Sequence, residues 1–171
     1  LNGMFSFAIW DEREKQLFAA RDRFGVKPFF YHVPKSGALW IASEIKALHA
    51  LGAPKSPCVS TWASYLVNGM YDHDGRSFWE DINRLPSGCF MTWSPGKDIH
   101  IEKWYDLVER FRLFNYDLIG NVQETLESLL YDSVRLRFRS DVPVGICLSS
   151  GLDSSLLLGL IQKIQGNESC L

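Results

Sequence analysis

Apolar and polar residues alternate along the first third of the chain with the period of two that is typical of half-buried β-strands. Polar residues, Gly and Pro interrupt this alternation at short intervals, as the turns of an antiparallel sheet require. The pattern predicts four short strands, at residues 4–10, 15–22, 29–33 and 38–43. Because tight turns join them, we expect these strands to form an antiparallel meander.

Two short helices are predicted after these strands. Ser43 is the expected N-cap of the first helix, which ends at Gly52. Ser60 or Thr61 is the expected N-cap of the second, which ends at an Asn-Gly pair. The next regular segment predicts a β-hairpin around the turn sequence SPGKD, with strands at residues 89–93 and 99–104.

Helical periodicity replaces alternation in the last third of the chain. From about Asp117, apolar residues recur with the spacing of one helix face, at Leu126, Leu129, Leu130 and Val134. Arginines at alternate positions of residues 135–140 are interpreted as a solvated face. The run VPVGICL (142–148) is too apolar for an edge strand and predicts a buried parallel strand. This change of pattern predicts a domain boundary at residues 105–116.

The composition is that of an ordinary globular protein, and it narrows the classes of partner. Hydrophobic residues make up 46% of the 171 residues and charged residues 22%, and the net charge of −2 offers no basic surface for nucleic acid or an anionic membrane. No apolar run reaches the roughly 18–20 residues of a membrane-spanning helix, and no secretory signal is recognised at the start. The first residue is Leu, which predicts that the sequence is an excerpt of a longer chain.

Four cysteines and four histidines are scattered along the chain. Neither set has the spacing of metal ligands, so we expect no structural zinc site, and scattered thiols favour a reducing, cytoplasmic compartment. Each histidine is interpreted as a surface or hydrogen-bonded residue. These residues are Cys58, Cys89, Cys147, Cys170, His32, His49, His73 and His100.

The sequence LSSGLDSS (148–155) follows the predicted buried strand and opens a leucine-rich helix. A tight turn of small residues before a helix presents backbone N–H groups to an anion, and α/β sheets bind ligands at this end of their strands. Gly151 permits close approach of the backbone. The hydroxyls of Ser149, Ser154 and Ser155 supply further donors to a phosphate. Asp153 would approach a phosphate only through a bridging Mg²⁺.

Spacing alone also allows a simpler interpretation, in which Asp153 or Ser154 caps the helix and Gly151 turns the chain. A sequence resemblance favours the phosphate site. LSSGLDSS resembles the pyrophosphatase-type loop, usually Ser-Gly-Gly-x-Asp-Ser, of ATP-dependent adenylating amidotransferases, and the preceding SDVPVG resembles the same flank in glutamine-hydrolysing asparagine synthases. Four other segments resemble the later half of that family's glutaminase domain: LNGMFSFAIWD (1–11), ARDRFGVKPFFY (20–31), SEIKAL (43–48) and FWEDINRLPSGCF (78–90).

The resemblance implies a fold class of α+β followed by α/β. Residues 1–104 would be the C-terminal part of a glutaminase domain, an antiparallel-sheet portion of the αββα fold of N-terminal-nucleophile enzymes. Residues 105–116 would be a linker. Residues 117–171 would be the N-terminal part of an asparagine synthetase domain, the first helix, strand, loop and helix of a parallel-sheet fold that binds an adenine nucleotide.

The resemblance also implies an ATP-dependent, glutamine-dependent ligase that makes asparagine from aspartate through a β-aspartyl-AMP intermediate, with ammonia supplied by glutamine hydrolysis. Its cofactors would be ATP and Mg²⁺, and its partners small molecules (ATP, aspartate and glutamine), with a homodimer left open. Asp153 would hold Mg²⁺ through the phosphates, and Met4 would lie near the ammonia channel. The residues implied to bind ATP and its pyrophosphate are Cys147, Leu148, Ser149, Ser150, Gly151, Leu152, Asp153, Ser154 and Ser155.

Two departures from the family pattern keep other interpretations open. Ser150 stands where the pattern has Gly, and a positive φ at that residue would cost roughly 1–2 kcal/mol. The family's glutaminase nucleophile is a terminal cysteine that would precede Leu1, so no catalytic residue is assigned, and residues 1–171 alone are expected to be inactive. The alternatives are a related amidotransferase that acts on another carboxylate, of the cell surface or of a secondary metabolite, and a non-catalytic truncated remnant.

Overall fold

The computed structural model describes residues 1–72, 74–114 and 120–167. Three features named above lie outside the described residues: His73, Cys170 and the expected helix start at Asp117. The chain divides into two compact units, Leu1–Leu113 and Phe114–Leu171. None of the helices in the described ranges is long and apolar enough to cross a membrane.

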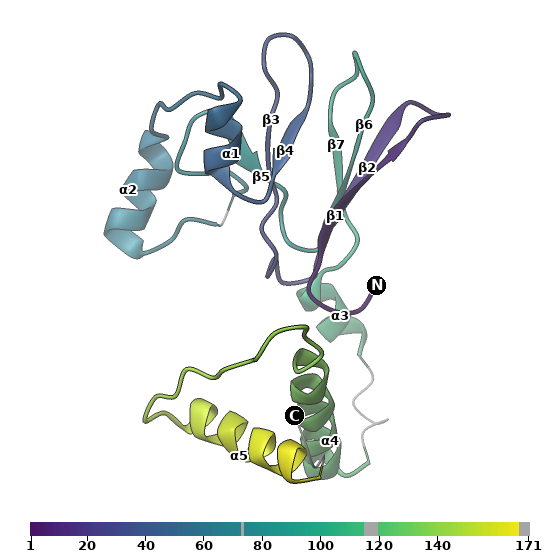
Figure 1. The fold of residues 1–171 in the computed structure, drawn as a ribbon, viewed down its shortest axis with the longest axis vertical. Helices are drawn as coiled ribbons and strands as arrows, with labels where there is room; N and C mark the ends of the chain where they lie inside the picture. Colours follow the sequence, from purple (N-terminus) through teal and green to yellow (C-terminus); the bar gives the residue numbers. More distant parts are fainter. Residues whose placement is uncertain (73, 115–119, 168–171) are drawn as a thin grey trace. The chain divides into compact units, whose positions relative to one another are not determined.

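The first unit contains two antiparallel sheets, a larger one with strand order β1-β2-β6-β7 and a smaller one with order β4-β3-β5 (Figure 1). The strands are β1 (Ser6–Asp11), β2 (Gln16–Arg21), β3 (Phe30–His32), β4 (Trp40–Ala42), β5 (Ile82–Arg84), β6 (Cys89–Trp93) and β7 (His100–Lys103). The predicted hairpin is confirmed as β6 and β7, in which Met91 lies opposite Ile101.

The predicted meander is wrong, because β2 and β3 belong to different sheets. β2 pairs with β6, and β3 pairs with β4 and β5. The chain leaves the larger sheet at a turn in which the buried Asp22 carboxylate accepts hydrogen bonds from three backbone N–H groups between Phe24 and Lys27. An alternating pattern shows which face of a strand is buried, but it does not show which strand is its neighbour.

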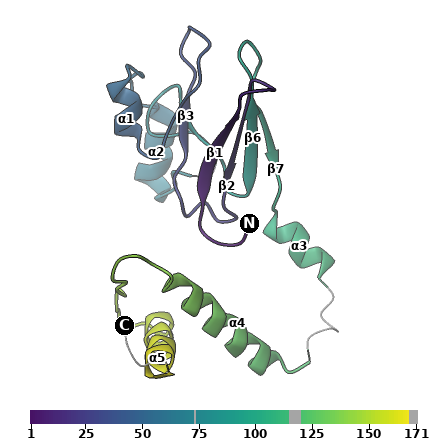
Figure 2. The same ribbon diagram turned by 45° about the vertical axis from the view of Figure 1, so that its right-hand side comes forward.

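The core of the first unit lies against the two sheets and the helices that cover the smaller one. Ala19, Leu85 and Met91 are fully buried in one cluster, and Leu48 and Ile82 belong to a second cluster. The helices α1 (Ile45–Ala50) and α2 (Val59–Asn68) lie on the side of the smaller sheet that faces away from the larger sheet (Figures 1 and 2). A third helix, α3 (Leu107–Leu113), occupies much of the stretch that was expected to be a linker.

The predicted N-caps of α1 and α2 are wrong. Glu44 rather than Ser43 is the N-cap of α1, Cys58 is the N-cap of α2, and neither side chain accepts a capping hydrogen bond. The hydroxyls of Ser60 and Thr61 lie within the first turn of α2, each 3.3 Å from the Cys58 sulfur. Both hydroxyls therefore contact the Cys58 sulfur, and neither forms the capping hydrogen bond with the backbone that was expected.

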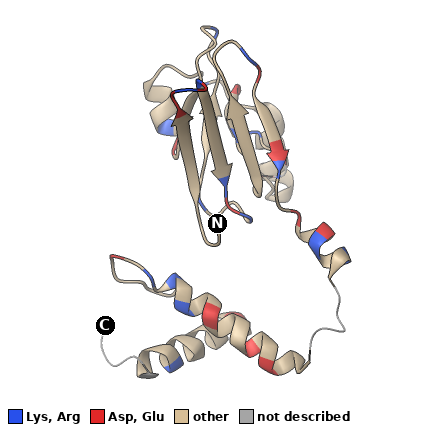
Figure 3. Cartoon of the chain, turned by 90° about the vertical axis from the view of Figure 1, so that its right-hand side faces the viewer, with Lys and Arg blue, Asp and Glu red and all other residues tan. Residues whose placement is uncertain are grey.

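The described residues of the second unit form two helices, α4 (Val122–Arg137) and α5 (Leu152–Asn167). Asn121 caps α4, and its side-chain oxygen accepts hydrogen bonds from two backbone N–H groups of the first turn. Val134 of α4 packs with Leu160 and Ile164 of α5, whereas Leu129 of the predicted apolar face is 65% exposed. Figure 3 shows the charged residues distributed along α4.

Residues 142–148 do not form the predicted buried strand. Val142, Val144 and Leu148 are 67%, 43% and 58% exposed. A parallel strand needs neighbouring strands for its hydrogen bonds and helices on both faces, and the described residues of the second unit contain no strand that could pair with this segment. The parallel-sheet fold of this region and the domain limits given above therefore stay predictions.

Candidate functional site

The loop before α5 is shaped by hydrogen bonds that meet at the Ser154 hydroxyl. This hydroxyl lies 2.9 Å from the Ser149 hydroxyl and accepts a 3.2 Å hydrogen bond from the Ser149 N–H. It also lies 2.9 Å and 3.1 Å from the carbonyl oxygens of Ser149 and Gly151. The Ser155 hydroxyl donates to the same Gly151 carbonyl at 2.9 Å. The serine hydroxyls that were expected to donate to a phosphate are thus already engaged within the loop.

The same loop leaves backbone donors free at the start of α5. The N–H groups of Leu152, Asp153 and Ser154 have no acceptor in the described part of the chain. The first N–H groups of a helix lack intrahelical partners, and together with the helix dipole they favour a bound anion. The start of this 16-residue helix therefore offers donors that fit a phosphate group.

Asp153 lies in the first turn of α5 and is exposed. Its carboxylate forms no ion pair or hydrogen bond with another described residue, so it is open to a cation. A carboxylate in this position also stabilises the positive end of a helix by itself. The capping interpretation and the Mg²⁺ interpretation of Asp153 therefore both agree with the geometry, whereas Ser154 accepts a hydrogen bond from Ser149 N–H rather than from an N–H of the helix.

Ser150 does not carry the backbone strain that the sequence raised as a concern. It is absent from the residues with positive φ, and Gly151 has no positive φ either. A Cβ atom added at Gly151 would lie 3.2 Å from the Ser149 hydroxyl oxygen, so the glycine serves the compactness of the loop. Cys147 and Leu148, at the entrance to the loop, are exposed.

Met4 lies two residues before the start of β1 and is 44% exposed, so it is not a core residue of the first unit. Its contact with an ammonia channel stays a prediction.

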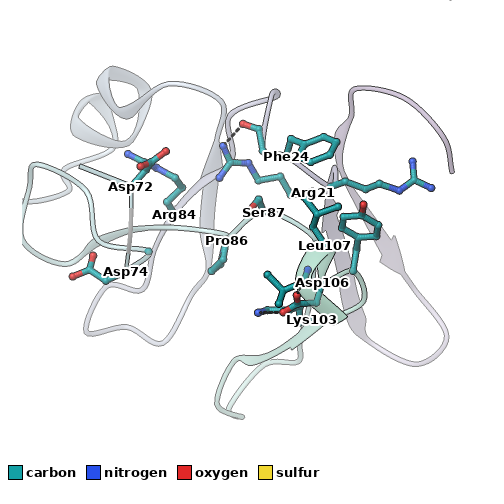
Figure 4. A pocket seen from close by; sticks show the side chains of 15 residues that line it. Arg21, Phe24, Asp72, Asp74, Arg84, Pro86, Ser87, Lys103, Asp106 and Leu107 are labelled. Carbon is teal, nitrogen blue, oxygen red and sulfur yellow. Dashed lines mark hydrogen bonds and ion pairs between the residues drawn. The ribbon is translucent and has the colours of Figure 1, made fainter. Parts of the chain in front are cut away.

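The structure also contains a cavity of about 640 Å³ in the first unit, lined by residues that the sequence analysis did not single out (Figure 4). Arg21 and Arg84 line it and are only 8% and 9% exposed. The Arg21 guanidinium donates to the backbone carbonyls of Lys27 and Leu85 at 2.7 Å and of Gly25 at 2.6 Å. Burial lowers the pKa of Arg21 below its ordinary value, and the positive charge of Arg84 lowers it further.

The signal for this cavity in the sequence is slight. Each arginine is the last residue of a short strand, β2 or β5, where a charged side chain is usually interpreted as solvated. Their burial depends on the turn around Asp22 and on the segment after β5, which come together only in the folded chain.

Two protein families match this chain. Residues 1–105 match the family described as glutamine amidotransferase domain, and residues 125–169 match the family described as asparagine synthase. The first match contains the two sheets and most of the cavity lining, and the second contains most of α4, the loop and α5.

Curated relatives are similar to this chain over almost its full length. Amidase chry2 of Gibberella zeae is 33% identical over 179 residues, which cover 100% of this chain and 26% of the relative. Glutamine-hydrolyzing asparagine synthetase 3 of Bacillus subtilis is 37% identical, with 94% and 25% covered. The glutamine-hydrolyzing asparagine synthetase of Homo sapiens is 30% identical, with 95% and 28% covered. The chain spans about a quarter of the length of these relatives.

Proposed function

Because the chain belongs to the asparagine synthase family, with a glutamine amidotransferase domain at residues 1–105, we propose that it acts in a glutamine-dependent, amide-forming ligase. The two matched segments follow each other in one chain, so ammonia released from glutamine by the first domain would be used by the second. The acceptor that we propose is the side-chain carboxylate of aspartate, and the product is asparagine.

The proposed reaction needs ATP because a carboxylate is a poor electrophile. The aspartate side-chain oxygen attacks the α-phosphorus of ATP, and pyrophosphate leaves with the electron pair of the broken P–O bond. Ammonia then attacks the acyl carbon of the β-aspartyl-AMP, the bond to AMP breaks, and a proton is lost from nitrogen. The chain's contribution would be to hold the pyrophosphate in place while it departs.

The observation that carries the ATP assignment is the set of free N–H groups of Leu152, Asp153 and Ser154. We assign these donors to the pyrophosphate and the Asp153 carboxylate to Mg²⁺ bound on the phosphates. Ser149, Ser150, Gly151 and Ser155 would form the wall of the same site. Cys147 and Leu148 would lie on the adenine side.

A second candidate is a ligase of the same chemistry that amidates a different carboxylate. The relative from Gibberella zeae is named an amidase, and its match covers 100% of this chain and 26% of the relative. Since the proposed ATP site is the same in both candidates, they differ only in the acceptor.

Calorimetric titration of the chain with magnesium–ATP tests the ATP site. We expect weak, saturable binding that Asp153→Asn reduces at least about tenfold, because a charged ligand to Mg²⁺ is lost. Asp141→Asn is the matched control, since it also removes an exposed aspartate of the second unit but lies outside the proposed site. Equal affinity for wild type and Asp153→Asn would refute the assignment of Asp153, and absence of binding would refute the site.

A further inference from the structure

The cavity of the first unit contains a buried cation without an anionic partner. Arg84, the last residue of β5, is 9% exposed and lines the cavity. Its guanidinium carbon lies 5.6 Å from the centre of the Phe30 ring and 5.4 Å from the centre of the Tyr71 ring. Among residues 1–72, 74–114 and 120–167 the guanidinium has no hydrogen-bond acceptor and no ion-pair partner.

An arginine in this state has unused binding capacity. Aromatic rings interact with the face of a guanidinium, whereas its N–H groups point outward in the plane and form a fork that matches a carboxylate. The residue as a whole is 9% exposed, and an anion that enters the cavity would form charge-assisted hydrogen bonds with these N–H groups.

The other charged side chains of the lining are less available. Five of them already have partners. Arg21 donates to three backbone carbonyls and Arg23 donates to Asn2. Asp74 pairs with Arg76, and Lys103 and Asp106 pair with each other. Asp72 is the remaining carboxylate of the lining, and it is exposed, so water screens its charge more than that of Arg84. Arg84 is therefore the strongest anchor for an anion.

The opposite side of the cavity combines apolar side chains with the Lys103–Asp106 ion pair (Figure 4). Leu107 and Val108 of α3 and the aromatic rings of Phe24 and Tyr105 line it. Figure 4 shows Arg84 and Leu107 on opposite sides, with Pro86 and Ser87 between them. A volume of about 640 Å³ has room for a small organic molecule that reaches from one side to the other.

We propose that this cavity binds a small carboxylic acid with an apolar or aromatic body, whose carboxylate is held by Arg84 and whose body lies against α3. A carboxylate fits better than a phosphate, because the carboxylates of Asp72, Asp74 and Asp106 line the same cavity and would repel a dianion more strongly than a monoanion. None of the lining residues belongs to the loop before α5, and the proposal does not depend on the proposed ligase activity.

Titration of the chain with 3-phenylpropanoate, followed by amide NMR, tests the site. We expect saturable shifts at residues of the lining with a dissociation constant below about 10 mM. The uncharged amide, 3-phenylpropanamide, has nearly the same shape, and it should bind at least about tenfold more weakly because it cannot form an ion pair with Arg84. Equal binding of acid and amide, shifts confined to other parts of the chain, or no saturable shift with the acid would each overturn the proposal.

Variants test the anchor directly. Arg84→Gln should weaken binding of the acid at least about tenfold, and Arg84→Lys should retain part of it. Arg13→Gln, in the exposed turn between β1 and β2, is the control and should bind like the wild type. If Arg84→Gln does not fold, Asp72→Asn decides, because removal of this exposed like charge should strengthen binding several-fold. Unchanged or weaker binding of the acid by Asp72→Asn would contradict the proposal that the cavity binds an anion.

Discussion

At the scale of single residues, Asp22 determines how the chain passes from the larger sheet to the smaller one. Its side chain is 1% exposed and accepts hydrogen bonds from the N–H groups of Phe24, Val26 and Lys27 at 2.9–3.1 Å. Its own carbonyl accepts hydrogen bonds from Gly25 and Gly88. One residue thus joins the turn after β2 to the turn before β6.

Asp22→Asn should lower the free energy of unfolding of the first unit by roughly 1–3 kcal/mol at neutral pH. The charged acceptor is lost, and the new amide NH₂ group would face N–H donors instead of acceptors. Urea unfolding followed by tryptophan fluorescence measures the change. Asp98→Asn, at an exposed position in the turn between β6 and β7, should change the midpoint little. An Asp22→Asn protein as stable as the wild type would contradict this role.

The pH dependence of this difference follows from the pKa of Asp22. Burial alone would raise that pKa, but hydrogen bonds from the backbone N–H groups of Lys27, Val26 and Phe24 outweigh burial and hold it below its ordinary value. A carboxylate with a lowered pKa stabilises the fold above its unfolded-state pKa, and this contribution is lost as the pH falls through the folded-state pKa. The stability gap between wild type and Asp22→Asn should therefore narrow below about pH 4, and a gap that widens on acidification would contradict the assignment.

At the scale of elements, the junction between β5 and β6 depends on Gly88. Gly88 has φ of 62°, and a Cβ atom added there would lie 2.7 Å from the carbonyl oxygen of Tyr105. Gly96, in the turn between β6 and β7, has a similar φ of 76°, but nothing lies within 4 Å of its added Cβ. An alanine at Gly96 would suffer only the strain of a positive φ, whereas an alanine at Gly88 would suffer that strain and a collision with Tyr105.

Gly96→Ala should lower the free energy of unfolding by roughly 1–2 kcal/mol, which is the strain of an alanine at positive φ. Gly88→Ala should lose at least about 1 kcal/mol more, because the backbone at Tyr105 must also move. Urea unfolding of both variants, followed by tryptophan fluorescence, measures the difference. Equal losses would show that the turn before β6 yields to the extra atom.

The sequence predicts elements better than it predicts their pairing. Alternation located β1 and β2, and the hairpin of β6 and β7 was recognised because its turn is local. The partnership of β2 with β6 spans about seventy residues and depends on the turn around Asp22, which no periodicity reveals. For residues 142–148 the element itself was predicted wrongly. Their apolar run fits a buried strand, but the described residues of the second unit provide no partner strand.

The candidate site was predictable only in part for a related reason. The loop before α5 is contiguous in sequence, so its residues could be named from the motif LSSGLDSS. The free N–H groups and the engaged Ser154 hydroxyl depend on local geometry that the motif does not specify. The cavity around Arg84 combines residues from the turn after β2, the segment before β5 and the start of α3, and no contiguous pattern connects them.

At the scale of the whole molecule, the two units differ in how much apolar surface they bury. The first unit has several fully buried residues in two clusters, whereas the buried cluster of the second unit consists of Val134, Leu160 and Ile164. Leu126, Leu129 and Leu152 of the second unit are 55%, 65% and 84% exposed. Since burial of apolar surface is the main source of stability, we expect the second unit to be the weaker one.

Urea should therefore unfold the chain in two steps. Far-UV circular dichroism reports strongly on α4 and α5, which have 16 residues each, whereas all six tryptophans lie in the first unit and their fluorescence reports only on it. Circular dichroism should begin to fall at lower urea than fluorescence. Coincident transitions would show that the two units unfold as one cooperative body.

A matched pair of variants assigns the first step to the second unit. Ile164 is 2% exposed and packs in its buried cluster, so Ile164→Ala should destabilise that unit by about 2 kcal/mol or more and shift the first step to lower urea. Leu156 lies on the same helix but is 48% exposed, so Leu156→Ala removes a side chain of similar size and should shift the first step much less. Neither change should move the fluorescence transition, because neither residue belongs to the first unit. A fluorescence midpoint that follows Ile164→Ala would mean that the small helical core supports the sheets as well, and the separate stability of the two units would be wrong.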